Sequence, residues 1–117
     1  MGLEDYVVEV PQISDFEEII NRIEQENQQG VAARMDSRIE EAEEHYKTAY
    51  SFAVSHEQLL HLGNVSASWY VSEFLTNMGD LSRITSNADD ALSLFSDAIA
   101  VVEGDETLEA KQRKAKA

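Results

Sequence analysis

The chain is 117 residues long, which is enough for one domain and too short for two separate cores. It contains no cysteine, and this excludes disulfides, thiolate zinc sites, iron–sulfur clusters and cysteine nucleophiles. The 23 acidic residues outnumber the 9 basic ones, giving a net charge of −14, while a hydrophobic content of 43% is typical of a folded chain.

The first 13 residues are predicted to form an extended arm outside the helical domain. Residues 6–10, Tyr-Val-Val-Glu-Val, favour β structure, yet no other segment reads as a strand that could pair with them. Two interpretations stay open. The arm lies over the helices of its own chain, or it adds to a sheet or groove of a neighbouring molecule.

Four helices are predicted from their capping residues, over residues 14–29, 31–62, 64–79 and 87–103. Glycines follow each stretch, as they do after helix C-termini: Gly30, Gly63, Gly79 and Gly104. Three of the stretches open on a side chain that can accept a hydrogen bond as an N-cap, and the second contains such a residue: Ser14, Asn64 and Asn87, with Ser37 inside the second stretch. The second helix would overhang its shorter partners unless it breaks near Asp36 and Ser37, where a capping box offers a new start.

Apolar side chains recur at helical spacing within each predicted helix. The second helix has a heptad seam whose members alternate four and three residues apart: Met35, Ile39, Ala42, Tyr46, Ala49, Ala53, His56 and Leu60. This seam offers a dimer interface, although packing within its own chain is the favoured interpretation. The pattern predicts an all-α fold with one helical domain over residues 14–104, either a four-helix antiparallel bundle or a helical array.

A charged and flexible tail is predicted at residues 105–117. Its basic residues give the last eight positions a charge of +4, whereas residues 1–109 carry −18: Lys111, Arg113, Lys114 and Lys116. Such a tail is usually a solvated chain end and less often grips nucleic acid or an acidic neighbour. Because the acidic body repels phosphates, we expect it to bind no nucleic acid directly.

The residues that enzymes and metal sites require are not arranged for that chemistry. His56 and His61 are five residues apart, which places their rings about 140° apart around a helix and prevents them from sharing a metal. Neither His45 nor His56 has a glutamate three residues before it, as a di-iron bundle requires. No glycine-rich phosphate loop and no nucleophile elbow occurs. We therefore expect no enzyme, no metal and no cofactor, and interpret His56 as a hydrogen-bonded core or rim residue.

The sequence leads us to expect no targeting signal at either end. Its first residues have no basic region and no long apolar run, and no stretch approaches the roughly 18 apolar residues that cross a membrane. We expect a soluble, intracellular protein, either cytoplasmic or part of a larger assembly such as a virion.

Two segments share a spacing of small and aromatic residues. Residues 42–49 read A-x3-Y-x2-A, and residues 91–98 read A-x3-F-x2-A, 49 positions later. This pattern resembles the second helix of a tetratricopeptide repeat, where alanines permit close helix approach and the aromatic side chain fills the gap between neighbours. Residues 69–70 and 79–80 resemble pieces of a repeat's first helix and its turn. The resemblance covers residues 38–103 and implies binding of a peptide or helix of another protein.

Together these observations favour a non-enzymatic helical interaction protein, such as an adaptor, a chaperone-like protein or an assembly subunit. It would bind a partner protein or its own copies, without a membrane, through apolar helix faces and the arm. The residues expected to contact the partner are Tyr6, Val8, Val10, Tyr46, Trp69 and Tyr70. The alternative is an acidic mimic of DNA that inhibits a DNA-binding protein, for which a charge of −14 is suitable.

Overall fold

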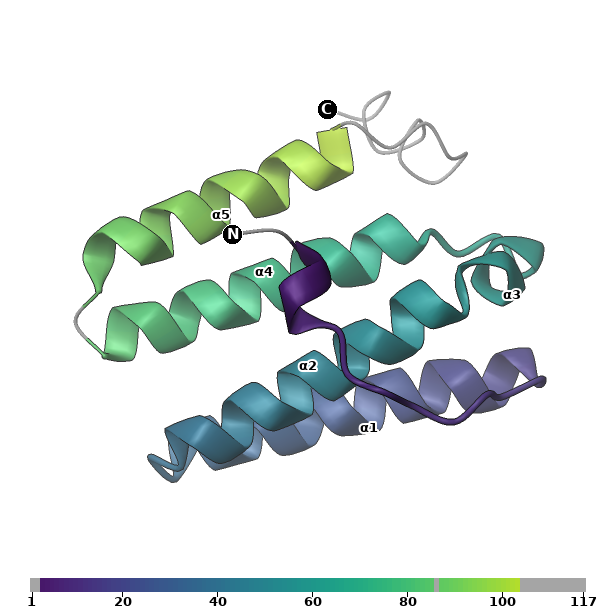
Figure 1. Ribbon diagram of the computed structural model, residues 1–117, viewed down its shortest axis with the longest axis horizontal. Helices are drawn as coiled ribbons and strands as arrows, with labels where there is room; N and C mark the ends of the chain where they lie inside the picture. The colour runs from purple at the N-terminus through teal and green to yellow at the C-terminus, as the bar shows by residue number, and fades with distance from the viewer. Residues whose placement is uncertain (1–2, 86, 104–117) are drawn as a thin grey trace.

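The computed structural model describes residues 3–85 and 87–103, and these residues are predominantly helical. A short 3-10 helix, η1 (Leu3–Tyr6), is followed by α1 (Phe16–Met35), α2 (Ile39–Ser55), α3 (Glu57–Leu62), α4 (Ala67–Ile84) and α5 (Ala88–Glu103). No strand occurs in these two ranges, so the all-α prediction is confirmed for them (Figure 1). The predicted cap Gly104 and the predicted tail lie outside the described residues.

The four long helices are arranged in a row. α1 and α2 form one antiparallel hairpin, α4 and α5 form a second one, and α2 packs against α4 (Figure 1). Within the described part of the chain, α1 and α5 at the two ends of the row are not a closely packed pair. The middle helices α2 and α4 therefore have close helical neighbours on both sides, whereas α5 packs closely on α4 alone among the described helices. α1 packs closely on α2 and is also joined to α4 by polar contacts, Asn27 Nδ2 to Glu73 Oε1 at 2.6 Å and Arg34 to Asp80 at 3.8 Å.

Gly30 and Gly79 lie inside helices and do not end them, so the predicted boundaries at residues 29 and 79 are wrong. Both glycines are buried. A Cβ atom on Gly30 would lie 2.5 Å from Cε1 of Tyr46, and one on Gly79 would lie 2.6 Å from Cε1 of Phe95. Each glycine thus makes room for an aromatic ring of the neighbouring helix, a requirement that outweighs the usual cost of glycine in a helix interior.

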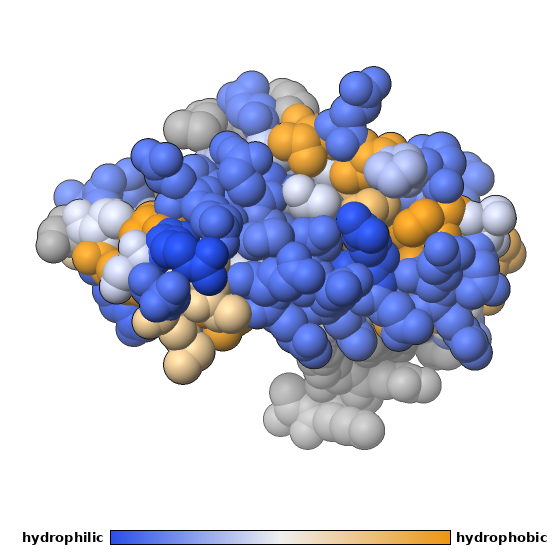
Figure 2. Space-filling view, turned by 90° about the horizontal axis from the view of Figure 1, so that it is seen from below, coloured by the Kyte–Doolittle hydropathy of each residue, from blue (hydrophilic) through white to orange (hydrophobic). Residues whose placement is uncertain are grey.

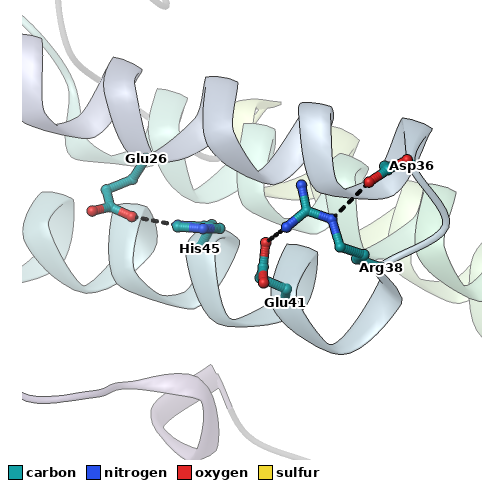
Figure 3. Close-up of polar contacts among 5 residues, drawn as sticks. All are labelled: Glu26, Asp36, Arg38, Glu41 and His45. Carbon is teal, nitrogen blue, oxygen red and sulfur yellow. Dashed lines mark hydrogen bonds and ion pairs between the residues drawn. The ribbon is translucent and has the colours of Figure 1, made fainter.

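The long helix predicted for residues 31–62 is interrupted twice. The first break falls at residues 36–38, in agreement with the alternative start predicted there, and Ser37 adopts a φ of 62°. Ser37 does not cap α2, because Arg38 occupies the N-cap position. The Arg38 guanidinium bonds both Asp36 and Glu41, and so ties the turn to the first turn of α2 (Figure 3). The second break, at His56, separates α2 from α3.

The remaining caps agree with the sequence in part. Asp15, rather than Ser14, caps α1, since its carboxylate accepts a hydrogen bond from the Glu18 backbone N–H at 2.9 Å. Gly63 follows α3 as predicted. Ser66, rather than Asn64, caps α4, with its hydroxyl accepting from the Ser68 backbone N–H.

Two clusters of buried side chains form the core. One joins both hairpins around Tyr46, Tyr50 and Phe74, and the other joins α1, α2 and α3 around Ile19 and Phe52. The predicted seam of the second helix supplies much of this core, since its members from Ala42 to Leu60 are all buried. Ile39 is half-buried, and the turn at 36–38 leaves the Met35 side chain 78% exposed.

Candidate protein-binding surfaces

The N-terminal arm is attached to α2 by hydrogen bonds. The arm supplies one carbonyl and two backbone N–H groups, and the pairs are Tyr50 Oη to the Leu3 carbonyl at 3.2 Å, Val8 N–H to Ser51 Oγ at 2.8 Å and Ile13 N–H to His56 Nε2 at 2.8 Å. The arm therefore lies across helices of its own chain, which agrees with the first of the two interpretations given above (Figure 1). Residues Leu3–Tyr6 of the arm form η1 and not a strand.

The hydrogen bonds of His56 determine which of its ring nitrogens carries the proton. Because its Nε2 accepts the hydrogen bond from Ile13, the neutral ring carries its proton on Nδ1. Nδ1 then donates to the Phe52 carbonyl oxygen at 2.8 Å. The interpretation of His56 as a buried, hydrogen-bonded residue is confirmed.

The three arm residues predicted to contact a partner pack on this chain. The Tyr6 ring meets the Phe74 ring edge-on, with 5.3 Å between centroids, while Tyr50 stacks on Phe74 at 4.5 Å. Val8 and Val10 are half-buried, and Val10 packs against the core cluster of α1, α2 and α3. Each of the three keeps part of its surface exposed at the edge of the arm.

The other three predicted contact residues lie apart from one another. The Tyr46 side chain is fully buried against Gly30, so it packs the first hairpin and presents no surface to a partner. Trp69, in the first turn of α4, is 37% exposed. Tyr70 is half-buried against the cluster of α1, α2 and α3. The structure does not gather the six residues into one surface.

The outer side of α5 presents apolar residues that are not among the six expected to contact a partner. Leu92 and Ile99 are 68% and 61% exposed, and a separation of seven places them on the same side of the helix. The side of the molecule on which α1 lies is mostly hydrophilic, with apolar residues in small separate patches (Figure 2). The apolar periodicity of α5 was visible in the sequence, but which of its residues lack a neighbour depends on the helix order.

A groove lies between η1, α2, α4 and α5. Its volume is about 580 Å³, and its apolar lining includes Leu75, Met78 and Leu94. An adjoining hollow of about 280 Å³ continues it along α5 toward Val101. Four carboxylates line the two hollows: Asp5, Glu43, Asp90 and Asp97. Lys47 also lines the groove and pairs with Glu43, at 3.7 Å between Nζ and Oε1.

The electrostatics of the groove are evident at Tyr6, whose side chain is part of its lining. Burial raises the pKa of the Tyr6 hydroxyl, and the negative charges of Glu43, Asp5 and Asp90 raise it further. A negative potential that disfavours a phenolate favours a cation at the same place. The groove is therefore suited to a positively charged occupant.

A wider hollow of about 710 Å³ lies beside α3 and the start of α4. Its lining includes Glu57, His61 and the exposed side chain of Leu62. Over the described ranges, no three or more histidine, aspartate or glutamate side chains are grouped so that they could hold a metal ion.

Comparisons with protein-family models, with curated proteins and with solved structures found no match to this chain. Among the helices of residues 3–85 and 87–103, none combines the length and the apolar character needed to cross a membrane.

Proposed function

We propose that this chain is a non-enzymatic protein-interaction module, built from two hairpins like those of tetratricopeptide repeats. An amphipathic helix of a partner protein, or of a second copy, packs on the outer side of α5. The proposal is supported by the way the two hairpins repeat one packing unit and by what covers each of them.

The packing unit consists of a glycine and an aromatic residue 16 positions later. Gly30 receives the ring of Tyr46 in the first hairpin, and Gly79 receives the ring of Phe95 in the second. The two units are 49 residues apart, the same offset as the two alanine–aromatic segments in the sequence. Two hairpins that pack alike and stack in sequence order form a repeat array, which is why a tetratricopeptide-like arrangement is favoured over a closed bundle.

The contrast between Tyr50 and Ile99, which occupy equivalent positions, carries the proposal. Tyr50 of α2 is buried because α4, the next helix of the row, supplies Phe74 as its stacking partner. Ile99 lies 49 residues later and is 61% exposed, because no described helix follows α5 in the row. A partner helix on α5 would therefore cover Ile99 as α4 covers Tyr50.

The helices at the two ends of the row, α1 and α5, differ in the polarity of their outer faces, as the proposed function requires. Repeat arrays stay monomeric where their terminal helices present polar outer faces. The exposed residues along α1 are largely Gln and Glu, including Glu24, Gln25 and Gln28. The outer face of α5 is not polar in this way, because it exposes Leu92 and Ile99. Exposed apolar residues gathered on one face mark interaction surfaces.

Charge substitutions on the two ends test the proposal. Leu92→Lys/Ile99→Lys should remove the association, while the control Gln25→Lys/Gln28→Lys, with the same change in net charge, should retain it. Self-association is measured by analytical ultracentrifugation over a range of concentrations. Partner binding is measured by quantitative capture from the native source with both variants. Equal association of the two variants would contradict the proposal.

A cysteine crosslink tests the geometry directly. The chain has no native cysteine, so Ser96→Cys places one thiol between Leu92 and Ile99 on the exposed side of α5. If a second copy is the occupant, oxidation should yield a disulfide-linked dimer whose amount rises with concentration, whereas Gln28→Cys on α1 should not.

The acidic character of the chain supports a second candidate, a mimic of nucleic acid that occupies the phosphate-binding surface of a DNA-binding protein. A net charge of −14 favours it. The two candidates respond differently to salt: a mimic's complex weakens steeply as ionic strength rises, whereas an apolar helix contact does not. The capture experiment, washed at low and high salt, separates them.

A further inference from the structure

We propose that the basic C-terminal segment of this chain, residues 111–116, binds in the acidic groove between η1, α2, α4 and α5. This inference concerns a surface other than the apolar side of α5 and does not depend on the proposed function. It is argued from the lining of the groove, from the charge and position of the segment, and from the length of chain that joins the two.

The groove offers apolar contact and negative charge together. Leu75 and Met78 of α4 and Leu94 of α5 line it, so the aliphatic stem of a lysine side chain can pack there while its ammonium group meets a carboxylate at the edge. Asp97 lines both the groove and its continuation along α5, and Asp5 lies on η1. The groove is therefore a site for a Lys- and Arg-rich segment and not merely a group of surface acids.

The C-terminal segment has the complementary composition. Lys111, Arg113, Lys114 and Lys116 place four cations within six residues, and no acidic residue follows Glu109. The rest of the chain carries −18, so this is the strongest positive segment available to the groove. Opposite charges steer such a segment to the groove and fix its orientation.

The length of chain beyond α5 permits this contact. The continuation of the groove is lined by Ala100 and Val101, close to the end of α5 at Glu103. The eight residues from Glu103 to Lys111 can span up to about 26 Å when extended. The distance along α5 from Val101 back to Asp90 is only about 16 Å. The segment can therefore reach either end of the groove of its own chain, at the high effective concentration that a short tether provides.

The groove and the apolar side of α5 are separate surfaces. Asp90 and Asp97 line the groove, and Leu92 and Ile99 each follow one of them by two positions, or about 200° around the helix. Filling the groove therefore leaves the exposed leucine and isoleucine uncovered. A failure of one proposal is distinguishable from a failure of the other.

A spin label on the segment tests the proposal in the full-length protein. Because the chain has no native cysteine, Ala115→Cys provides a single attachment point for a nitroxide. Paramagnetic broadening of backbone amide signals in ¹⁵N-labelled protein then reports which residues the segment approaches. At an ionic strength of about 0.05 M, we expect the signals of Ser93, Leu94 and Asp97 to lose most of their intensity. At about 0.5 M salt, where screening is strong, we expect the intensity to return.

Matched charge variants show whether the groove is the cause. Asp5→Asn/Asp97→Asn should abolish the broadening, whereas Glu17→Gln/Glu24→Gln on α1 removes the same charge and should retain it. These groove acids are chosen because Asp90 accepts a hydrogen bond from Asn87 and Glu43 pairs with Lys47. Circular dichroism verifies that each variant keeps the helical content of the parent.

Mixing samples determines which chain supplies the segment. Spin-labelled protein without ¹⁵N is added to ¹⁵N-labelled protein without the spin label. Groove broadening confined to the doubly labelled sample shows binding within one chain, and groove broadening in the mixture shows exchange between copies. Both results support the groove as the binding site. Broadening that spreads equally over α1, that stays beside the C-terminal end of α5, or that survives Asp5→Asn/Asp97→Asn would overturn the proposal.

Discussion

The α1–α2 and α4–α5 hairpins place a glycine against an aromatic ring at the same spacing, yet their surroundings differ. The first hairpin is covered by α4 on one side and crossed by the N-terminal arm, while the second is covered by α2 on one side and has an exposed apolar side on the other. The comparison shows that a repeated local pattern fixes how two helices pack. The position of the hairpin in the row then decides which of its residues become surface.

A partly buried polar pair distinguishes the first hairpin further. Glu26 of α1 accepts a hydrogen bond from Nδ1 of His45 on α2 at 2.9 Å (Figure 3). Arg22 also pairs with the Glu26 carboxylate, at 3.5 Å. In the second hairpin, the equivalent residues 49 positions later are Leu75, in place of Glu26, and Leu94, in place of His45. Both leucines line the groove. The first hairpin thus joins its helices by a hydrogen bond at the position where the second hairpin supplies two apolar side chains to the lining of the groove.

The largest expected effect comes from a charge in the packing unit. Tyr46→Asp should reduce the free energy of unfolding by about 4 kcal/mol or more, because it buries an unpaired carboxylate in the core. Phe95→Asp should cost less, since Phe95 is only half-buried. Chemical denaturation of both variants measures the difference. A Tyr46→Asp protein with parental stability would show that the first hairpin packs in another register.

Adding one methyl group to each glycine sharpens the comparison of the two units. Gly30→Ala should destabilise by about 1–3 kcal/mol, because the Tyr46 ring has no free space into which it can move. Gly79→Ala should cost less, since the half-buried Phe95 ring can shift toward solvent and alanine favours the helix by about 1 kcal/mol. Thermal unfolding of the two variants gives the order. Equal destabilisation by the two substitutions would mean that the Tyr46 and Phe95 rings are equally confined.

Removal of the arm's attachment point tests what the arm adds to the first hairpin. His56→Ala should cost about 1–3 kcal/mol, because it leaves the Ile13 backbone N–H without its acceptor. The amides of Ile13 and Val8 should then exchange their hydrogens faster than before. His61→Ala changes an exposed histidine and serves as the control. Unchanged exchange in His56→Ala would show that the histidine does not hold the arm.

The smallest effect concerns Glu24 and Glu73, which occupy equivalent positions in α1 and α4. Burial and the charge of Glu24 raise the pKa of the Glu73 carboxyl, so its ionisation costs the folded state free energy at neutral pH. Glu73→Gln removes that cost and should stabilise the protein by about 0.5 kcal/mol or less at neutral pH. The advantage should vanish in acid, where the parental Glu73 is protonated in both states.

Glu24→Gln provides the complementary measurement for this pair. It should lower the pKa of Glu73 toward the ordinary value, as followed by an NMR pH titration of the Glu73 side chain. An unchanged Glu73 titration in that variant would show that the two hairpins do not interact through these charges.

The sequence alone predicts those features of the fold that depend on residues close together along the chain. Helical periodicity identified the seam from Ala42 to Leu60, and the turn chemistry near Ser37 indicated a break. The glycines were misinterpreted because a cap and a close approach use the same residue, and only the ring of Tyr46 or Phe95 distinguishes them. The exposure of Ile99 could not be predicted, because it depends on which helix follows in space.

The arm's candidate residues illustrate the same limit. Tyr6, Val8 and Val10 were selected by their β propensity, which reflects how side chains pack on a neighbouring surface. Tyr6 meets Phe74 of α4 and Val8 bonds Ser51 of α2, both more than 40 positions along the chain, while Val10 packs against the cluster of α1, α2 and α3. No local pattern encodes these contacts.

The row order of the helices has a kinetic consequence. Most packing joins helices that are neighbours in sequence, and contacts of this kind close small loops and form early. The arm's hydrogen bonds to α2 span 43 to 47 residues, so they must wait until α2 and its hairpin partner are in place. In a stopped-flow experiment, helical circular dichroism should therefore recover before the Ile13 amide becomes protected, so that the arm becomes ordered after the helices on which it lies.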